Sequence, residues 1–377
     1  MIYLDHNATT PPAAEVTAAM ADCLTRTWGN PSSLHACGQL ARAVREAARR
    51  ALGTLIHAAP ADILFTSGAT EATNQLLLGP ALKAGGQPRH LITSAIEHPC
   101  VLEPARVLES LGWRVTRVGV GADGVVDPQE VAAAIAPDTA LISVMLANND
   151  TGVIQPVREI AALARARGVP VHTDAVQAVG RIPVDFDALG VDFLTLSAHK
   201  FYGPKGVGAL VARDVAKLSP YLFGGSQERS LRAGTENLPG IAGLGAAAKL
   251  ALAEMADSAA RVAALRDRLQ AGLLAAFPDA LVNGGSAPRV PGALNITFPG
   301  IDAVTAVMNL DIAEVAAATT SACSTASRQP PYVLTAMGRS PEQALASLRF
   351  SLGRANTAAE IDRTVATVAG IIPLLRA

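Results

Sequence analysis

The stretch VDFLTLSAHKFYGPKG, from Val191 to Gly206, decides the fold. Its largely apolar first part predicts a buried strand, and Lys200 follows that strand just before a glycine-rich turn. Lysine is rarely buried without a partner, and burial lowers its pKa and makes the amine a nucleophile toward carbonyl groups. Lys200 is therefore a candidate Schiff-base lysine. The alternative is an ordinary strand end at which the ammonium reaches water.

Outward from this stretch, short β-branched runs alternate with helical patterns from about residue 60 onward. This alternation predicts an α/β fold with a mostly parallel, seven-stranded sheet that is covered on both faces. The last two strands are joined by a loop alone, which predicts one antiparallel pair. The expected strands are Ile63–Thr66, His90–Thr93, Arg114–Val118, Ala140–Leu146, Val169–Thr173, Asp192–Leu196 and Val207–Ala212.

A second, smaller α/β domain is expected after about residue 240. We predict a large domain over 13–250, and a small domain over 251–377 that also includes the extended residues 1–12. The elements expected there are a long helix from Leu238 to about Phe277, strands Ala293–Phe298 and Ser347–Ser351, and a last helix from Ala358 to Leu375.

Composition excludes several function classes. The 377 residues carry a net charge of −1 without a basic or acidic block, which gives no support for nucleic-acid or membrane-surface binding. We find no apolar stretch of the roughly 18 residues that span a bilayer and no signal-peptide pattern at the first residues, so we expect a cytoplasmic protein. The four cysteines form no C-x-x-C pair, which argues against a zinc site or redox dithiol.

Polar residues follow several of the expected strands, where ligands bind in such sheets. Residues 65–74, FTSGATEATN, read as a strand that ends at Gly68 before a helix beginning at Ala69 or Thr70. The unpaired N–H groups of that helix favour an anion such as phosphate, and a plain Ser/Thr N-cap is the alternative. Asp174 closes another strand and suits a pyridinium nitrogen, or else it caps a helix near Ala175.

Two further strand ends carry a histidine and an asparagine. His98 suits acid–base chemistry or stacking on an aromatic cofactor, although a lone histidine is more often structural. Asn149 lies in Asn148-Asn149-Asp150 before Gly152, which reads first as a turn. Phosphate site, aspartate, histidine and lysine at the strand ends of one sheet are together the set that pyridoxal 5'-phosphate requires.

A thiol and an arginine complete the candidates. Cys323 lies among small and polar residues before Pro330-Pro331, so we expect an exposed, flexible loop whose thiol is reactive. An accidental surface cysteine is the alternative. Arg349 alternates inward on the strand Ser347–Ser351 and is suited to clamp a substrate carboxylate, or else it is a surface arginine.

These residues resemble the PLP-dependent cysteine desulfurases of the NifS and IscS type (group I of the class-V aminotransferase family), nearly end to end. The motifs that carry the resemblance are Tyr3-Leu4-Asp5 with Ala8-Thr9-Thr10, Gly29 to Ser33, Thr66 to Glu71, Glu97-His98, Asn148-Asn149, Asp174 with Gln177, Ser197 to Lys200, Arg232 to Asn237, Ser321-Ala322-Cys323 and Arg349 to Arg354.

The resemblance implies a homodimeric fold-type-I enzyme that uses pyridoxal phosphate. It implies that Lys200 binds the cofactor covalently and moves the Cα proton of the substrate. Asp174 would pair with the pyridine nitrogen, Gln177 would bond the ring oxygen, and His98 would stack on the ring and transfer protons. By the same resemblance the phosphate is held by Ala69, Thr70, Ser197 and His199, and by Thr235 of the other subunit.

For the substrate, the resemblance implies that Asn149, which also contacts the cofactor, and Arg349 hold the carboxylate of L-cysteine. Cys323 would take the sulfur as a persulfide, release alanine and pass the sulfur to an acceptor such as an iron–sulfur scaffold protein. No intrinsic metal, nucleic acid or membrane is implied, although Cys323 is a conceivable ligand of a transient iron–sulfur cluster. Three departures from the family pattern, Thr320, Ser226 and Arg328 to Pro331, affect the loop and the acceptor.

Related lyases acting on selenocysteine, a transaminase and a catalytically idle docking partner are the alternatives. A transaminase gives the loop thiol no role. The retention of Lys200, Asp174, His98 and Cys323 argues against an idle protein.

Overall fold

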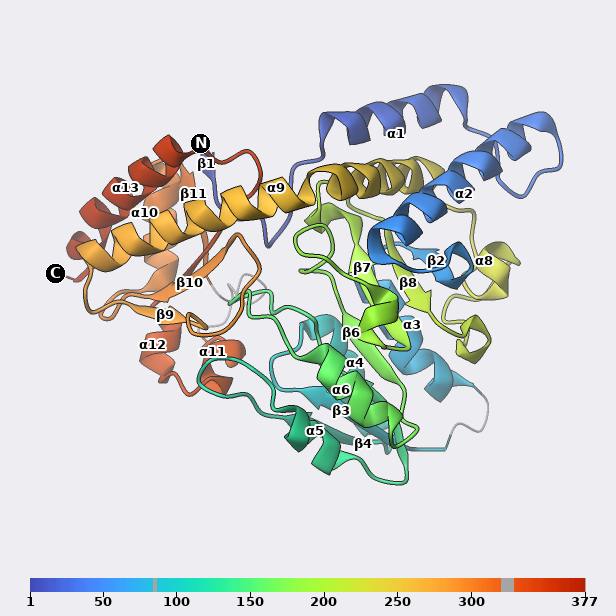
Figure 1. The fold of residues 1–377 in the computed structure, drawn as a ribbon, viewed down its shortest axis with the longest axis horizontal. Coiled ribbons are helices and arrows are strands. Elements are labelled where there is room, and N and C mark those ends of the chain that lie inside the picture. The colour runs from blue at the N-terminus through green and yellow to red at the C-terminus, as the bar shows by residue number, and fades with distance from the viewer. Residues whose placement is uncertain (84–86, 320–328, 377) are drawn as a thin grey trace.

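A seven-stranded sheet forms the centre of the larger part of the molecule (Figure 1). The computed structural model describes residues 1–83, 87–319 and 329–376. The strand order is β2-β8-β7-β6-β5-β3-β4. Strands β3 to β7 run parallel, and β8 lies antiparallel between β7 and β2. The strands are β2 Ile63–Thr66, β3 His90–Ser94, β4 Arg114–Val118, β5 Thr139–Ser143, β6 Val171–Asp174, β7 Phe193–Ser197 and β8 Gly208–Ala212.

The predicted α/β class and the mostly parallel sheet are therefore confirmed, as is the antiparallel pair β7–β8. The strands of this sheet begin and end within two residues of the predicted bounds, except that β5 stops at Ser143 and not at Leu146. The residues beyond it remain buried and still bond to β6: the Val144 N–H donates to the His172 carbonyl at 3.1 Å, and the Leu146 N–H donates to the Asp174 carbonyl at 2.8 Å.

Helices cover both faces of this sheet. Buried side chains of α3 and α4 form one core with the sheet, and those of α2, α6 and the first half of α9 form the core on the other face. The helices of this part are α1 Ala14–Arg26, α2 Ala36–Ile56, α3 Ala69–Leu82, α4 Pro99–Ser110, α5 Pro128–Ala134, α6 Val157–Arg165, α7 Phe186–Leu189 and α8 Gln227–Ser230.

A smaller sheet with its own core lies at the other end of the molecule (Figure 1). Its order is β12-β13-β10-β9, and a separate parallel pair joins β1 to β11. The elements are β1 Ile2–Tyr3, β9 Leu281–Asn283, β10 Ala293–Thr297, β11 Val315–Ala316, β12 Ala318–Thr319 and β13 Ser347–Ser351, with helices α10 Ala303–Ile312, α11 Tyr332–Ala336, α12 Pro341–Leu345 and α13 Ala358–Arg376.

The helix α9, Leu238–Ala276, belongs to both cores (Figure 1). Ile241 and Leu244 pack with the large sheet, while Leu265 and Leu269 pack with the small one. The boundary near residue 250 stays a prediction, and it falls inside this continuous helix. By length and composition α9 is apolar enough to cross a membrane, which corrects the expectation that no stretch qualifies. Half of its most apolar window is buried inside the protein, as in the core helix of a soluble protein, so the indication is weak.

The first dozen residues cross from the small sheet to the large one. Leu4 is fully buried in the small core, and its N–H donates to the carbonyl of Ala316 at 2.8 Å. Thr10 already bonds to the large part, with its N–H donating to the carbonyl of His199 at 2.9 Å. The segment between them therefore passes directly beside Lys200.

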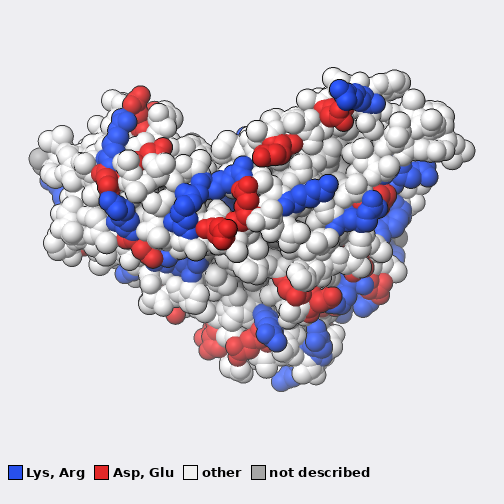
Figure 2. Space-filling model, turned by 45° about the horizontal axis from the view of Figure 1, so that its top comes forward, with Lys and Arg blue, Asp and Glu red and all other residues white. Residues whose placement is uncertain are grey.

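Charged side chains of both signs are interspersed on the face that Figure 2 shows. This agrees with the net charge of −1 and with the lack of a single-sign block in the sequence. Many of the charges are paired at the surface, as Arg268 and Asp362 are at 2.6 Å.

A buried ion pair fixes the chain just before α9. The Arg49 guanidinium donates to both carboxylate oxygens of Glu228, at 2.6 and 3.0 Å, and the Phe65 N–H donates to the same carboxylate at 2.9 Å. Glu228, Arg229 and Ser230 all have positive φ, a conformation that costs energy in residues other than glycine. The pair therefore holds a strained turn in place.

We predict that Glu228→Ala lowers the free energy of unfolding by about 3 kcal/mol or more, because it leaves a buried guanidinium without its partner. Urea denaturation followed by circular dichroism measures the change. Asp362→Ala is the control, since it breaks an exposed pair and should leave the midpoint unchanged. Equal midpoints for the two variants would show that the buried pair does not stabilise the turn.

Candidate active site

A cavity of about 730 Å³ opens at the carboxyl ends of the parallel strands, beside the crossing N-terminal segment. Its wall contains Asn7, His98, Asn149, Lys200 and Arg349, so it brings together four of the side chains that the sequence singled out. Residues 329–332, which come just before and at the start of α11, also line it. Asp174, Gln177, Ser197 and His199 do not line this cavity and are described below.

Lys200 ends a short 3-10 turn directly after β7. Its Nζ donates to the carbonyl oxygens of Asn7 and Ala8, at 2.6 and 2.7 Å. Burial and then the positive charges of Arg181 and Arg349 lower the pKa of Lys200 to about 8. The amine is therefore held in the cavity and loses its proton more easily than an ordinary lysine.

Arg181 is a residue that the sequence analysis missed. Its guanidinium donates to the carbonyl of His6 at 2.7 Å, to the side-chain oxygen of Asn7, and to the carbonyl of Lys200. Burial lowers the pKa of Arg181 to about 10. It joins the N-terminal segment to the strand end that carries the lysine. No local sequence pattern marks it, because its partners lie far away in the chain.

Asp174 ends β6 and is buried. One carboxylate oxygen accepts the N–H of Val176 at 2.9 Å, and the other accepts the thiol of Cys100 at 3.6 Å. Burial raises the pKa of Asp174, while the charge of Lys200, and that of His98 when its ring is protonated, oppose the rise. Asp174 caps a turn here, since no helix begins at residue 175.

His98 is the N-cap of α4, and its Nδ1 accepts the N–H of Cys100 at 3.1 Å. A neutral imidazole with Nδ1 as acceptor carries its proton on Nε2. Burial, with Lys200 adding to it, lowers the pKa of His98, and Asp174 acts in the opposite direction. The ring thus forms part of the cavity wall in its neutral form at pH 7.

The start of α3 is the segment that the sequence predicts to bind an anion. Its N-cap is Gly68, which has no side chain to offer, so the Ser/Thr N-cap alternative is wrong. The Ala69 N–H donates to the buried hydroxyl of Ser197 at 2.8 Å, and Thr70 is exposed next to it. The Ser197 hydroxyl therefore lies at the N-terminus of α3, and a helix N-terminus stabilises an anion.

Gln177 and His199 contact the same N-terminal segment. The Gln177 amide donates to the carbonyl of Asn7 at 3.0 Å, and a His199 ring nitrogen lies 3.1 Å from the hydroxyl of Thr9. Burial and the charge of Lys200 lower the pKa of His199 to about 4, so its ring is neutral at pH 7.

Arg349 points inward from β13 and is only 4% exposed, so the surface alternative is wrong. Its guanidinium donates to Asp5 at 2.8 Å and to Asp150 at 3.3 Å. The Asn149 amide donates to the same Asp150 oxygen at 2.9 Å. The two residues expected to hold a substrate carboxylate are thus linked through one acidic side chain.

Other candidates are not joined to this set. Thr70 and Thr235 are exposed, and within the described ranges no hydrogen bond connects their side chains to the cavity residues. Ser226 is the exposed N-cap of α8. Cys323, Thr320 and Arg328 lie outside the described residues, and the expectation of an exposed, flexible loop around Cys323 falls there too.

The described residues fit pyridoxal phosphate with an amino acid beside it. Within the described part of the chain, three buried polar atoms at the site have no partner: Gln177 Oε1, Asn149 Oδ1 and Arg349 Nε. Buried polar atoms normally have a hydrogen-bond partner, so these three atoms indicate that a polar ligand binds here. Asp174 and Lys200 supply the acid and the amine that the cofactor requires.

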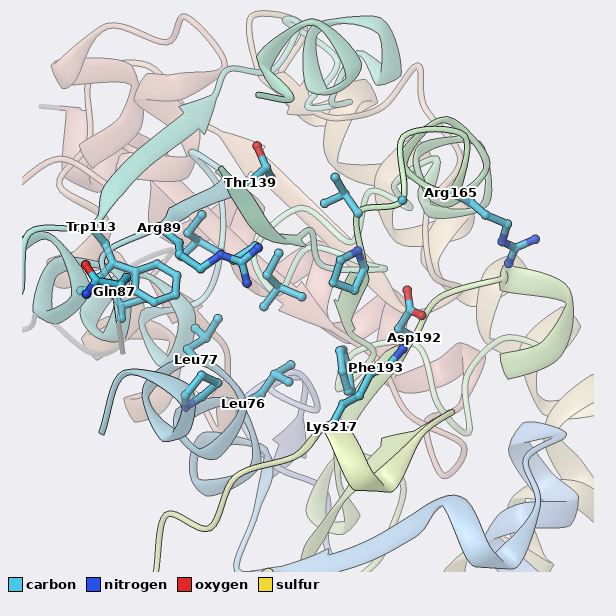
Figure 3. A pocket seen from close by; sticks show the side chains of 18 residues that line it. Leu76, Leu77, Gln87, Arg89, Trp113, Thr139, Arg165, Asp192, Phe193 and Lys217 are labelled. Carbon is cyan, nitrogen blue, oxygen red and sulfur yellow. The ribbon is translucent and has the colours of Figure 1, made fainter. Parts of the chain in front are cut away.

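A second cavity, of about 670 Å³, lies at the amino ends of β3, β5, β6 and β7, and Figure 3 shows the side chains that line it. Leu76, Leu77, Trp113 and Phe193 give it an apolar lining, with Arg89 at its side. None of the candidate site residues lines this cavity.

Comparisons with known proteins identify the family of this chain. The Aminotransferase class-V family matches residues 2–364. The chain is 43% identical over 375 residues to cysteine desulfurase IscS of Dictyoglomus turgidum, covering 100% of this chain and 95% of the relative. A solved NifS-like protein is 35% identical, with a TM-score of 0.92 over 99% of this chain and 100% of its own. The solved structure of SspA in complex with cysteine is 34% identical, with a TM-score of 0.83 over 95% of this chain and 100% of its own.

We predict that the rate at which the cofactor-free protein takes up pyridoxal phosphate rises about tenfold per pH unit up to about pH 8 and then levels off. With a pKa of about 8, roughly one Lys200 amine in ten is neutral at pH 7. Stopped-flow absorbance of the bound cofactor measures the rate. A rate that keeps rising beyond pH 9.5 would mean that Lys200 titrates as an ordinary lysine.

Proposed function

The chain belongs to the cysteine desulfurases of the class-V aminotransferase family, and we propose that Lys200 and His98 transfer protons in its reaction and that Cys323 accepts the sulfur. The observation that carries the proposal is the buried amine of Lys200, which has a lowered pKa and shares one cavity with His98 and Arg349. The substrate is L-cysteine, and the products are L-alanine and a sulfur atom bound to the enzyme.

The protein's own groups would hold the cofactor around this amine. Asp174 would keep the ring nitrogen protonated, and Gln177 would offer its amide to the ring oxygen. His98 would pack on the ring.

Ser197, His199 and the start of α3 at Ala69 and Thr70 would bind the phosphate. When bound, pyridoxal phosphate supplies an electron sink for negative charge at the substrate Cα.

Lys200 and His98 would then move protons. Lys200 would take the proton from Cα of L-cysteine and return one later, which requires an amine that is neutral in part at pH 7. His98, neutral and at the cavity wall, would deliver or accept protons beside it. Asn149 and Arg349 would orient the substrate by its carboxylate.

Cys323 would accept the sulfur. Its thiolate would attack the sulfur of L-cysteine, so that an S–S bond forms as the Cβ–S bond breaks and the electron pair of that bond stays on carbon. Protonation of the carbon gives alanine, and the enzyme keeps a persulfide. One thiol and one cysteine give one persulfide and one alanine, so atoms and electrons balance without an added oxidant.

We also propose that the enzyme is a homodimer in which Thr235 binds the phosphate of the partner's cofactor. Trp28, Leu34 and Phe223 are 73%, 84% and 76% exposed, which is unusual for large apolar side chains and suits burial against a second copy. A sulfur acceptor such as an iron–sulfur scaffold protein would take the persulfide.

A cytoplasmic location is part of this proposal. The described cysteines, Cys23, Cys37 and Cys100, are free thiols, as is common for proteins of a reducing compartment.

We predict that Lys200→Ala abolishes the visible absorbance of the bound cofactor and reduces alanine formation at least a thousandfold, because Lys200 is the one lysine among the described residues that line the cavity. Absorbance after incubation with pyridoxal phosphate and an assay of alanine from L-cysteine measure both. Lys205→Ala is the control, since this exposed lysine lies five residues further on. A variant at residue 200 that keeps the band and the activity would refute the assignment.

We predict that Cys323→Ser keeps the cofactor absorbance but loses sulfide release from L-cysteine in the presence of a thiol reductant. A hydroxyl is a far weaker nucleophile than a thiolate toward sulfur. Cys37→Ser is the control, because it changes an exposed cysteine of the described part of the chain, and it should keep full activity. Equal sulfide production by the Cys323→Ser variant and the wild type would exclude Cys323 as the sulfur carrier.

A further inference from the structure

A buried carboxylate lies where a substrate carboxylate is expected to bind, which is electrostatically unfavourable. Asp150 lines the active-site cavity and is 3% exposed. A second acidic group beside a carboxylate-binding arginine repels the incoming substrate. The position therefore needs a compensating role.

The contacts of Asp150 indicate that role. Its Oδ1 accepts the Asn149 amide at 2.9 Å and the Arg349 guanidinium at 3.3 Å. One acceptor atom thus bridges a large-sheet turn and a strand of the small sheet, from which the two predicted substrate-binding side chains come.

The backbone of Asp150 is fixed from both sides. Its N–H donates to the Asn148 side chain at 2.9 Å, and Asn148 in turn donates to the carbonyl of Ile96 at 3.0 Å. The Asp150 carbonyl accepts the amide of Asn295 at 3.3 Å, and Asn295 is the β10 residue opposite Arg349. The carboxylate is therefore held at a defined place between the two sheets.

Arg349 and Asn149, which both contact Asp150, each keep one side-chain atom without a hydrogen-bond partner in the described part of the chain. Arg349 uses Nη1 for Asp150 and for the backbone carbonyl of Asn149, both at 3.3 Å, and Nη2 for Asp5, while its Nε has no partner within the described ranges. Asn149 uses Nδ2 for Asp150, and its Oδ1 is likewise unpaired there. The unpaired donor on a guanidinium that is 4% exposed indicates a ligand with an acceptor oxygen.

We propose that Asp150 is a positioning residue whose carboxylate holds Asn149 and Arg349 together in the arrangement that receives the carboxylate of the amino-acid substrate. The proposal rests on the proposed function, because it takes L-cysteine as the ligand of Arg349. Asp5 holds the same guanidinium from the N-terminal segment at 2.8 Å and shares the charge compensation. Asp150 itself does not touch the reacting atoms.

The test is the steady-state kinetics of Asp150→Ala and Asp150→Asn with L-cysteine, with the bound-cofactor spectrum recorded for each. We expect KM to rise about tenfold or more in the alanine variant with kcat within about threefold, because a carboxylate contact remote from the broken bond contributes to binding uniformly. Asp150→Asn keeps an acceptor oxygen at the same place and should recover most of the affinity. The spectrum should stay that of the wild type in both.

A second measurement separates positioning from general damage to the site. L-Alanine keeps the substrate carboxylate, and cysteamine lacks it; both are titrated against the cofactor absorbance. In Asp150→Ala, the affinity for L-alanine should fall by about the same factor as for L-cysteine, and the affinity for cysteamine should not change. Asp138→Asn removes one acidic charge from an exposed pair with Arg114 and is the control.

An unchanged or lower KM in Asp150→Ala would overturn the proposal, and so would an equal loss of affinity for cysteamine. A wild-type protein that forms no alanine from L-cysteine would instead refute the proposed function, so the two failures are distinguishable.

Discussion

The bond between the Lys200 ammonium and the carbonyl oxygens of Asn7 and Ala8 is the contact on which the rest of the site depends. It exists because residues 1–12 leave the small core and cross to the large one at the end of β7. The same segment supplies Asp5 to Arg349 and receives the Arg181 guanidinium. Positive side chains that would otherwise repel one another are thus arranged around one extended piece of backbone.

Lys200, Arg181 and Arg349 are three cations of the site, and they are held in two different ways. Lys200 bonds to carbonyl oxygens, Arg181 mainly to carbonyl oxygens and an amide, and Arg349 to two carboxylates. Neutral partners leave the pKa of Lys200 and Arg181 lowered by burial, whereas the acidic partners of Arg349 compensate its charge. The site therefore keeps one amine that loses its proton easily next to a guanidinium that is paired with two carboxylates.

Much of this arrangement is predictable from the sequence, because the strands carry strong patterns. Strands β4 and β13 begin and end at the expected residues, and Lys200, Asp174 and His98 come at strand or turn ends. Arg181 and the role of Asp150 are not predictable, since their partners are distant in the chain and Asp150 reads locally as a turn residue. The two-residue strands β11 and β12 depend on pairing with β1 and β13, which no local pattern reveals.

The continuous helix α9 has a consequence for how this chain can be divided. Its 39 residues contribute buried side chains first to one core and then to the other. A cut near residue 250 would expose an apolar helix face on both fragments, so neither half is an autonomous folding module. A chimera of two relatives must therefore take the whole of α9 from one parent, together with one of the two sheets. The other sheet must then pack against a helix that comes from a different parent.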